Sequence, residues 1–205
     1  MTSSPWLARF GAVCGVLLGL SLGVPGIIEA FTGETALTSF VVGLGAVFGT
    51  PALTAFYLHH SAAAGRFGAV AYAVNLIGLG LFGGVSFTLN LVFFFLDGPV
   101  VADLMSGPTR IAVLGSMAVF VTGTVLFGVS MMRARVFPLP ASLVYIVSLV
   151  LLTVLSSLPD TLLTSAMHVI ACGVLVWMSA LVWSGTATAG PAARQGVPVA
   201  SASGR

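Results

Sequence analysis

The sequence predicts an all-α fold, a polytopic integral membrane bundle of six transmembrane helices with both termini in the cytoplasm. Apolar residues make up 58% of the 205 residues and charged residues only 6%, against roughly 25% charged residues in a soluble domain. The apolar residues also fall into six runs, each long enough to cross a bilayer and separated by charged residues, Gly and Pro. A water-soluble fold of this length could not cover its surface with so few charges.

The first predicted span covers residues 10–28 and follows a short polar lead that ends in Arg9. It is too long for the hydrophobic part of a signal peptide, no small-x-small cleavage site follows it, and five more apolar runs come after it. We therefore expect it to stay in the membrane. Pro25 and Gly26 should kink or end this helix just before Glu29.

The second predicted span covers residues 36–58 and contains several Gly residues followed by Pro51. Glycines allow close helix approach, and Pro51 should bend the helix near the centre of the bilayer. The adjacent His59 and His60 then open a short polar connection that ends at Arg66. We expect both histidines to be interfacial residues at a cytoplasmic helix end.

The third predicted span, residues 67–96, has no charged side chain. As one helix it would be about 45 Å long, well beyond the roughly 30 Å of the hydrocarbon core, so it must tilt, bend or extend past the membrane. The pair at residues 83–84, Gly-Gly, is the natural place for a bend. Its polar side chains fall near multiples of 3.6 residues and therefore share one face, which we predict to line an interior and bind substrate: Asn75, Ser86 and Asn90.

A loop from Asp97 to Arg110 separates this run from the next, and Val100 to Met105 can form one or two helical turns at the membrane interface. The transmembrane domain then continues to residue 184, and the tail, rich in Ala, Gly, Ser and Pro, should be a disordered cytoplasmic segment. The remaining predicted spans are residues 111–132, 138–158 and 161–183. The predicted tail is residues 185–205.

Charge placement predicts the orientation. With the N-terminus in the cytoplasm, all Arg residues except Arg110 lie inside, as the positive-inside rule requires, and every acid lies on or near the outer face. A composition rich in Ala, Gly, Val and Arg without Lys is typical of a GC-rich genome. The predicted location is therefore the cell membrane, a bacterial inner membrane, with several crossings.

A faint internal repeat accompanies this topology. The five residues Arg-Phe-Gly-Ala-Val occur at 9–13 and again at 66–70, and Ala-Val-Phe occurs at 46–48 and again at 118–120. Both pairs lie on helices that run in the same direction. The pattern indicates a parallel repeat of three helical hairpins, although short matches also arise by chance in a chain so rich in Ala, Gly and Val.

Three ionisable residues are the candidates for acid/base catalysis: Glu29, His168 and Asp97. His168 belongs to a polar stripe of the sixth span and lies about 12 Å below the outer boundary, a depth at which an ionisable side chain is costly. Glu29 ends the first helix and could turn inward over a cavity as a general acid. The alternatives are a neutral His168 that joins helices, an interfacial Glu29, and Asp97 as a loop acid.

Two further residues join the three on the third span as candidates for substrate binding. Ser165 belongs to the same polar stripe as His168. Arg110 could hold a phosphate or carboxylate head group if the loop charges face the cavity mouth, or could pair with Asp97 or Asp103. Asn90 and His168 are expected at matching depths, so that the two polar faces meet.

Several chemistries are excluded. The chain has no Lys, which rules out a Schiff base, and it has no CxxC, no HExxH and no phosphate-binding Gly-rich loop after a strand. We therefore predict neither a metal nor a cofactor. The formal charge of +2 is too small and too scattered for nucleic acid. The expected partners are membrane lipids and a hydrophobic small molecule, and Gly- and Ser-rich helix faces would also allow an oligomer.

These features predict an intramembrane pocket in the outer half of the bundle for a lipid-, isoprenoid- or polyketide-like molecule. The function favoured by the candidate residues is a cofactor-independent acid/base enzyme of the isomerase or cyclase type. The alternatives are a transporter or binding module for a hydrophobic compound, and an accessory membrane subunit without a ligand.

Overall fold

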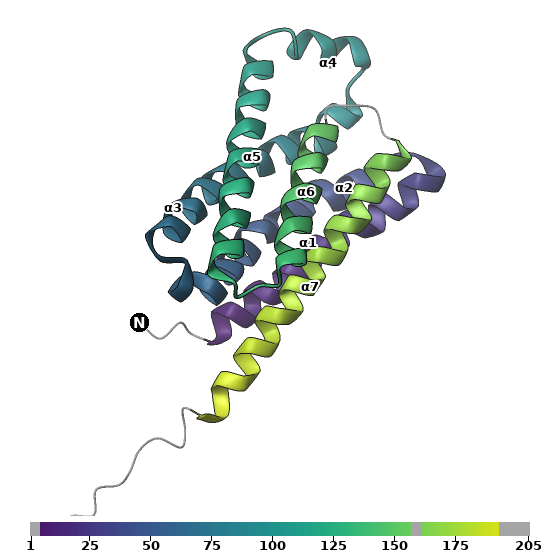
Figure 1. The fold of residues 1–205 in the computed structure, drawn as a ribbon. Coiled ribbons are helices and arrows are strands. Elements are labelled where there is room, and N and C mark those ends of the chain that lie inside the picture. The colour runs from purple at the N-terminus through teal and green to yellow at the C-terminus, as the bar shows by residue number, and fades with distance from the viewer. Residues whose placement is uncertain (1–4, 157–160, 193–205) are drawn as a thin grey trace, which may run out of the picture.

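A computed structural model describes residues 5–156 and 161–192, which are helical almost throughout (Figure 1). In these two ranges, six helical segments pass along the length of the bundle, which confirms the predicted all-α architecture and helix count. The elements are α1 (Pro5–Thr32), α2 (Ala36–Gly45), η1 (Ala46–Phe48), α3 (Gly49–Leu91), η2 (Phe93–Phe95), α4 (Gly98–Leu104), α5 (Pro108–Ala134), α6 (Leu139–Leu155) and α7 (Leu162–Ala192).

The long helix α3 is two helices joined at Gly65. This residue has φ 58° and ψ −153°, a conformation open essentially only to glycine. The chain reverses there. Contacts between the two sides show this: the Tyr57 and Tyr72 rings stack with centroids 4.4 Å apart, and the hydroxyls of Thr54 and Tyr72 lie 3.0 Å apart. The first limb of α3 (residues 49–64) thus completes the second span, and the second limb (residues 66–91) forms the third.

Two expectations about proline are corrected. Pro25 does not end α1, which continues to Thr32; freed backbone groups inside a bundle can find other partners. Pro51 lies in the first turn of α3, where its missing N–H costs no intrahelical bond. The interruption that it was expected to cause is the single 3₁₀ turn of η1 just before it.

The predicted helix ends differ mainly toward the C-terminus. The pair at residues 83–84 keeps helical backbone angles, and the α-helix of this run ends at Leu91 instead of continuing to residue 96. The short helix expected in the loop after Asp97 is α4. Helix α7 continues to Ala192, into the segment that we expected to be disordered, and residues 193–205 lie outside the described residues, as do residues 157–160 at the predicted boundary of the last two spans.

The six segments follow one another around a ring in chain order. Helix α1 packs on α2 and α3, the second limb of α3 packs on α5, and α6 packs between α5 and α7. The extensive contact between α1 and α7 closes the ring (Figure 1). A closed ring of helices encloses an interior, whose lining decides what the protein can bind.

Glycines allow α1 and α7 to approach closely in this ring. On α1 they recur every four residues, at Gly11, Gly15, Gly19 and Gly23, a small-xxx-small pattern. A Cβ atom built on Gly23 would lie only 2.6 Å from the Cβ of Cys172 on α7. This spacing was a readable signal for the α1–α7 contact in the sequence, but it was not used in the prediction.

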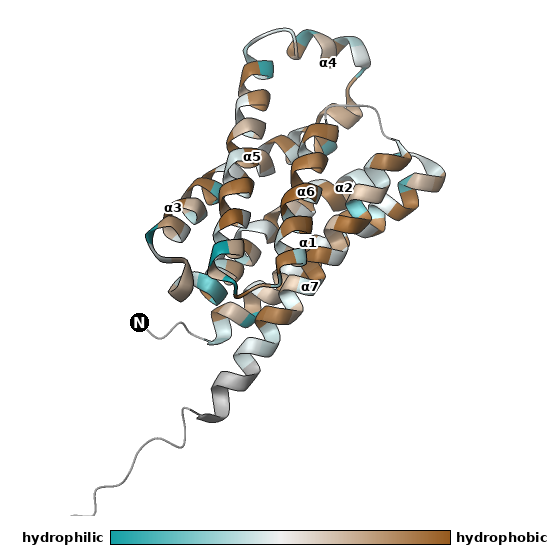
Figure 2. Cartoon of the chain, in the orientation of Figure 1, coloured by the Kyte–Doolittle hydropathy of each residue, from teal (hydrophilic) through white to brown (hydrophobic). Residues whose placement is uncertain are grey.

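The outer surface of the ring is apolar. Hydrophobic residues cover most of α5 and α6, while hydrophilic residues gather mainly near the ends of the bundle (Figure 2). Large side chains such as Ile111 and Leu162 are each 76% exposed. Among the described residues, four stretches are long and apolar enough to cross a membrane. One of them, Ala36–Phe95, is the folded pair of spans, and Leu139–Leu155 is a shorter apolar helix. This surface is typical of a protein surrounded by lipid.

The two chain ends described by the structure lie at the same end of the bundle (Figure 1). The Arg9 guanidinium near the start of α1 lies 5.6 Å from the Trp183 ring of α7. The Arg133 guanidinium near the end of α5 lies 5.0 Å from the ring of Phe67, just after the Gly65 turn. The arginines Arg9, Arg66, Arg133 and Arg135 therefore share one end, and α4 with the α1–α2 turn forms the other.

The prediction that both adjacent histidines are interfacial is wrong for His60. Its side chain is 1% exposed and its ring lies 5.3 Å from the ring of Phe127. The Nδ1 atom lies 2.7 Å from the Phe56 carbonyl oxygen, and Nε2 lies 3.5 Å from the Ser130 hydroxyl. His60 therefore joins α3 to α5 inside the bundle, whereas His59 stays half-buried.

Candidate functional site

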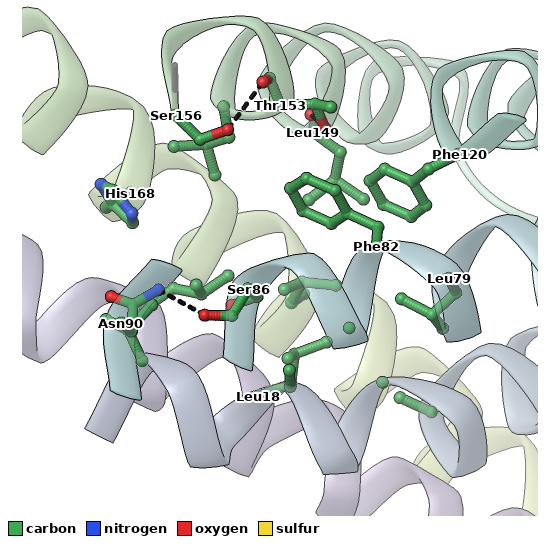
Figure 3. A pocket seen from close by; sticks show the side chains of 18 of the residues that line it. Leu18, Leu79, Phe82, Ser86, Asn90, Phe120, Leu149, Thr153, Ser156 and His168 are labelled. Atoms are coloured by element: carbon green, nitrogen blue, oxygen red, sulfur yellow. Dashed lines mark hydrogen bonds between the residues drawn. The ribbon is translucent and has the colours of Figure 1, made fainter. Parts of the chain in front are cut away.

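A cavity of about 280 Å³ lies inside the ring of helices (Figure 3). Each of the six spans contributes to its wall, through residues that include Leu18, Phe56, Asn75, Phe120, Tyr145 and His168. Most of the wall is apolar, with a small number of polar groups. This is the usual composition of a small-molecule site.

Three helices of the wall present side chains in the same register. On α1 the lining positions include 18, 22 and 29, on the second limb of α3 they include 75, 79 and 86, and on α6 they include 145, 149 and 156. In each helix the second position follows the first by four residues and the third follows the second by seven. The lining residues of α1, α3 and α6 therefore have the same helical spacing, and each helix turns an equivalent face to the cavity.

The cavity reaches the end of the bundle that carries the acids. Glu34 and Ser156 line it and are themselves exposed, so they mark its mouth, and Glu29 beside them is half-buried. Three turns along α1 separate Glu29 from Leu18 at the inner end, a depth of about 16 Å. A long, narrow molecule fits this shape better than a compact one.

A buried polar network forms the inner end of the cavity. The Asn75 side-chain amide donates to the Tyr145 hydroxyl at 3.3 Å, and its carbonyl oxygen accepts from Thr124 Oγ1 at 3.3 Å. All three residues are at most 4% exposed. The network joins α3, α5 and α6, so Asn75 has a structural role in addition to lining the cavity.

Asn90 and His168 face the cavity nearer its mouth, as Figure 3 shows. The Asn90 amide donates to the Ser86 carbonyl oxygen at 2.8 Å. His168 Nδ1 lies 2.9 Å from the carbonyl oxygen of Thr164. A carbonyl can only accept, so Nδ1 carries the proton, and in a neutral imidazole Nε2 is then the atom that can accept one.

The unbroken course of α1 brings Glu29 to the cavity. Because the helix continues through Pro25, Glu29 stays on the face that carries Leu18 and Leu22. Gly26, one turn before it, lies against α7, where a Cβ built on Gly26 would come within 2.6 Å of the Cβ of His168. Glu29 and His168 therefore line the cavity from adjacent helices, about one helical turn apart in height.

Comparisons of the chain with protein-family models, curated proteins and solved structures find no match. The function must therefore be argued from the cavity itself. Within residues 5–156 and 161–192, no group of three or more His, Cys, Asp or Glu side chains is placed to hold a metal ion.

The structure places five of the predicted site residues on the cavity wall, namely Glu29, Asn75, Ser86, Asn90 and His168. It does not bring the other three there. Asp97 is exposed at the N-cap position of α4, where its side chain makes no capping hydrogen bond, and Arg110 is exposed in the first turn of α5. Ser165 is buried against α1, where its carbonyl oxygen would lie 3.3 Å from a Cβ on Gly26. The loop geometry and the rotation of α7 decide these positions.

The side chains that α6 contributes to the cavity wall were not predicted from the sequence. Tyr145, Thr153 and Ser156 line the cavity from this helix, and Thr164 adds a hydroxyl from α7. Thr153 and Ser156 donate to carbonyl oxygens of their own helix, at 2.7 and 2.8 Å. Their helical spacing was visible in the sequence, but no residue of this span had been considered as a candidate.

Proposed function

We propose that this chain is a multi-pass protein of a bacterial inner membrane whose cavity binds a hydrophobic small molecule with one polar end. The observation that carries the proposal is the cavity wall, which is mostly apolar along its depth and carries Glu29, Asn90 and His168 toward one end. The apolar outer surface supports placement in lipid.

The proposed orientation has both termini in the cytoplasm. The end of the bundle with the start of α1, the Gly65 turn and the end of α5 carries Arg9, Arg66, Arg133 and Arg135. The positive-inside rule assigns this end to the cytoplasm. The cavity mouth, at the opposite end, then opens in the outer half of the membrane.

The proposed architecture is a threefold repeat of helical hairpins. The first hairpin is α1 with α2 and the first limb of α3, the second is the other limb of α3 with α5, and the third is α6 with α7. The shared register of α1, α3 and α6 at the cavity supports the repeat, together with the matching residues at 9–13 and 66–70. Superposition of the hairpins in an experimental structure tests it, and hairpins that do not superpose would refute it.

A second candidate function is acid/base isomerisation or cyclisation of the bound molecule. It is favoured by Glu29 and His168 lining one cavity from adjacent helices. In this scheme His168 Nε2 removes a proton from the substrate, Glu29 donates one to another atom of it, and water at the mouth returns both residues to their starting states. Protons balance, and no oxidant or cofactor is needed.

A cavity-filling substitution tests the binding function. Gly83 lines the cavity, and a Cβ built on it would meet nothing within 4 Å, so the Gly83→Leu side chain can enter the open space. Gly84 is exposed, does not line the cavity and has equally open surroundings, so Gly84→Leu is the matched control. Both variants and the wild-type protein would be placed in lipid nanodiscs, and binding of radiolabelled decan-1-ol would be measured.

We expect saturable decan-1-ol binding by the wild-type protein and by Gly84→Leu, above simple partition into the bilayer. Binding by Gly83→Leu should fall to the partition background. Equal binding by all three proteins, or background binding by all three, would refute a ligand cavity at this place.

The enzymatic candidate has its own test. Wild-type protein, Glu29→Gln and His168→Ala would be incubated in liposomes made from a membrane lipid extract, and the lipids would then be separated by chromatography. A catalyst converts one lipid species into another with the wild-type protein but with neither variant. Release of an unaltered lipid across the vesicle membrane would indicate transport instead.

A further inference from the structure

We infer that the occupant of the cavity is a hydrophobic amine or a similar amphiphile with one positive charge. Its cation would pair with Glu29 near the mouth, and its apolar body would extend toward Leu18 and Phe56. This inference rests on the proposed binding function and names the chemical class that the site selects.

The charges on the cavity wall are negative. Glu29 and Glu34 line it, and no arginine is among the described residues of its wall. The described residues of the wall thus include two carboxyl groups and no arginine. A carboxylate or phosphate group would meet like charge there, which costs binding energy, whereas a cation gains an ion pair.

The arginine that was expected to hold an anionic head group lies elsewhere. Arg110 is exposed at the start of α5, beyond the short helix α4, and it does not line the cavity. An anionic ligand would therefore have no arginine to pair with among the described residues of the wall. This position decides against the phosphate or carboxylate ligand that the sequence had suggested.

The second acid at the mouth is held in place by the chain. Glu34 precedes the capping box that opens α2, in which Thr35 and Thr38 exchange hydrogen bonds. The hydroxyl of Ser39, which is 0% exposed, donates to Glu34 Oε1 at 2.6 Å. Ser39 therefore holds the Glu34 carboxyl group at the mouth, and Glu29 is the carboxylate that we assign to the ligand.

The walls below the acids suit an apolar body and a nearby cation. Phe82 and Phe120 stack with ring centroids 4.7 Å apart and an interplanar angle of 3°, and both line the cavity (Figure 3). Aromatic faces attract cations as well as hydrocarbon. At the inner end both polar ends of the Asn75 amide already bond to Tyr145 and Thr124. The Asn75 amide therefore needs no hydrogen bond from the ligand at the inner end.

Three ligands with the same decyl chain separate the alternatives: decylamine, decan-1-ol and decanoate. Binding of each radiolabelled compound would be measured with protein in nanodiscs of phosphatidylcholine, which carries no net charge, and the Gly83→Leu background would be subtracted. We expect decylamine to bind about tenfold more tightly than decan-1-ol, because a charge-assisted hydrogen bond replaces a neutral one. Decanoate should bind more weakly than decan-1-ol.

Two variants locate the effect. Glu29→Gln should remove the advantage of decylamine, so that its Kd equals that of decan-1-ol, which should change little. Asp97→Asn removes an exposed acid at the same end of the bundle that does not line the cavity, and it should leave all three Kd values unchanged.

Each result has one meaning. If decan-1-ol binds in a Gly83→Leu-sensitive way but decylamine is no tighter, the inference is wrong and the binding function stands. If decylamine is tighter and Glu29→Gln keeps that advantage, the assignment of Glu29 is wrong. If none of the three binds above background, both the inference and the proposed function are wrong.

Discussion

The side-chain amide of Asn75 donates to the hydroxyl of Tyr145 at 3.3 Å and so joins α3 to α6 at the inner end of the cavity. Both residues occupy equivalent positions in their helices, each four residues before a lining leucine, and Leu18 holds the same position on α1. The register that builds the cavity wall thus also places the hydrogen bond that holds two of its helices together.

A double-mutant cycle on this pair should show coupling. Asn75→Leu, Tyr145→Phe and the double variant would be compared with the wild-type protein by thermal unfolding in mild detergent. Hydrogen bonds between helices in membranes contribute about 0.5–2 kcal/mol, so we expect a coupling of that size. Asn75→Leu should be the more destabilising single change, because it also leaves Thr124 without its partner. Single effects that simply add up would show that the hydrogen bond contributes nothing.

The Gly65→Ala variant should destabilise the hairpin of α3. At φ 58° and ψ −153° a Cβ atom is strained, although nothing lies within 4 Å of the position where it would be built. Such backbone conformations cost about 1–3 kcal/mol in residues other than glycine. The loss should be seen as a lower unfolding midpoint in detergent.

The control for Gly65→Ala is Gly80→Ala. Gly80 is also exposed and also has open space at its Cβ position, but its backbone is helical. This variant should be neutral or stabilising by up to about 1 kcal/mol, as for Gly to Ala in a helix interior. If the two variants melt at the same temperature, the strained turn at Gly65 is not present in the protein.

Gly23→Ala should disturb the contact between α1 and α7. Its new Cβ would lie 2.6 Å from the Cβ and 2.8 Å from the Sγ of Cys172. We expect a loss of about 1–3 kcal/mol, the usual cost of overpacking. Cys172→Gly removes both atoms, so the double variant should be more stable than Gly23→Ala alone. If Cys172→Gly gives no such rescue, α1 and α7 do not meet at this point.

The helix count and one wall of the cavity could be predicted from the sequence. Long apolar runs separated by polar connections locate the spans, and the 3.6-residue period places Asn75, Ser86 and Asn90 on one face. These signals are local, because they depend only on the composition and spacing of one run. The chain reversal at Gly65 also falls inside the polar connection that was expected between the second and third spans.

The parts that could not be predicted depend on contacts between helices. The rotation of α7 turns Thr164 and His168 to the cavity and Ser165 to α1, and no pattern within the run distinguishes these faces. His60 was assigned to the interface because it stands next to His59 at a predicted helix end, yet it packs against Phe127 and Ser130 of α5. Pro25 was expected to kink or end α1, but the helix continues past it to Thr32, because freed backbone groups inside a bundle can find other partners.

Cysteine labelling in intact cells should establish the orientation. In a background with Cys14→Ala and Cys172→Ala, single cysteines would be introduced by Ser106→Cys, between α4 and α5, and by Ala63→Cys, beside the Gly65 turn. Both positions are exposed, and they lie at opposite ends of the bundle. Because the arginine-rich end should be cytoplasmic, a membrane-impermeant maleimide should label Ser106→Cys in intact cells and label Ala63→Cys only after the membrane is permeabilised. The reverse pattern would invert the orientation and place the cavity mouth in the cytoplasmic half, and labelling of both sites in intact cells would argue against a spanning protein.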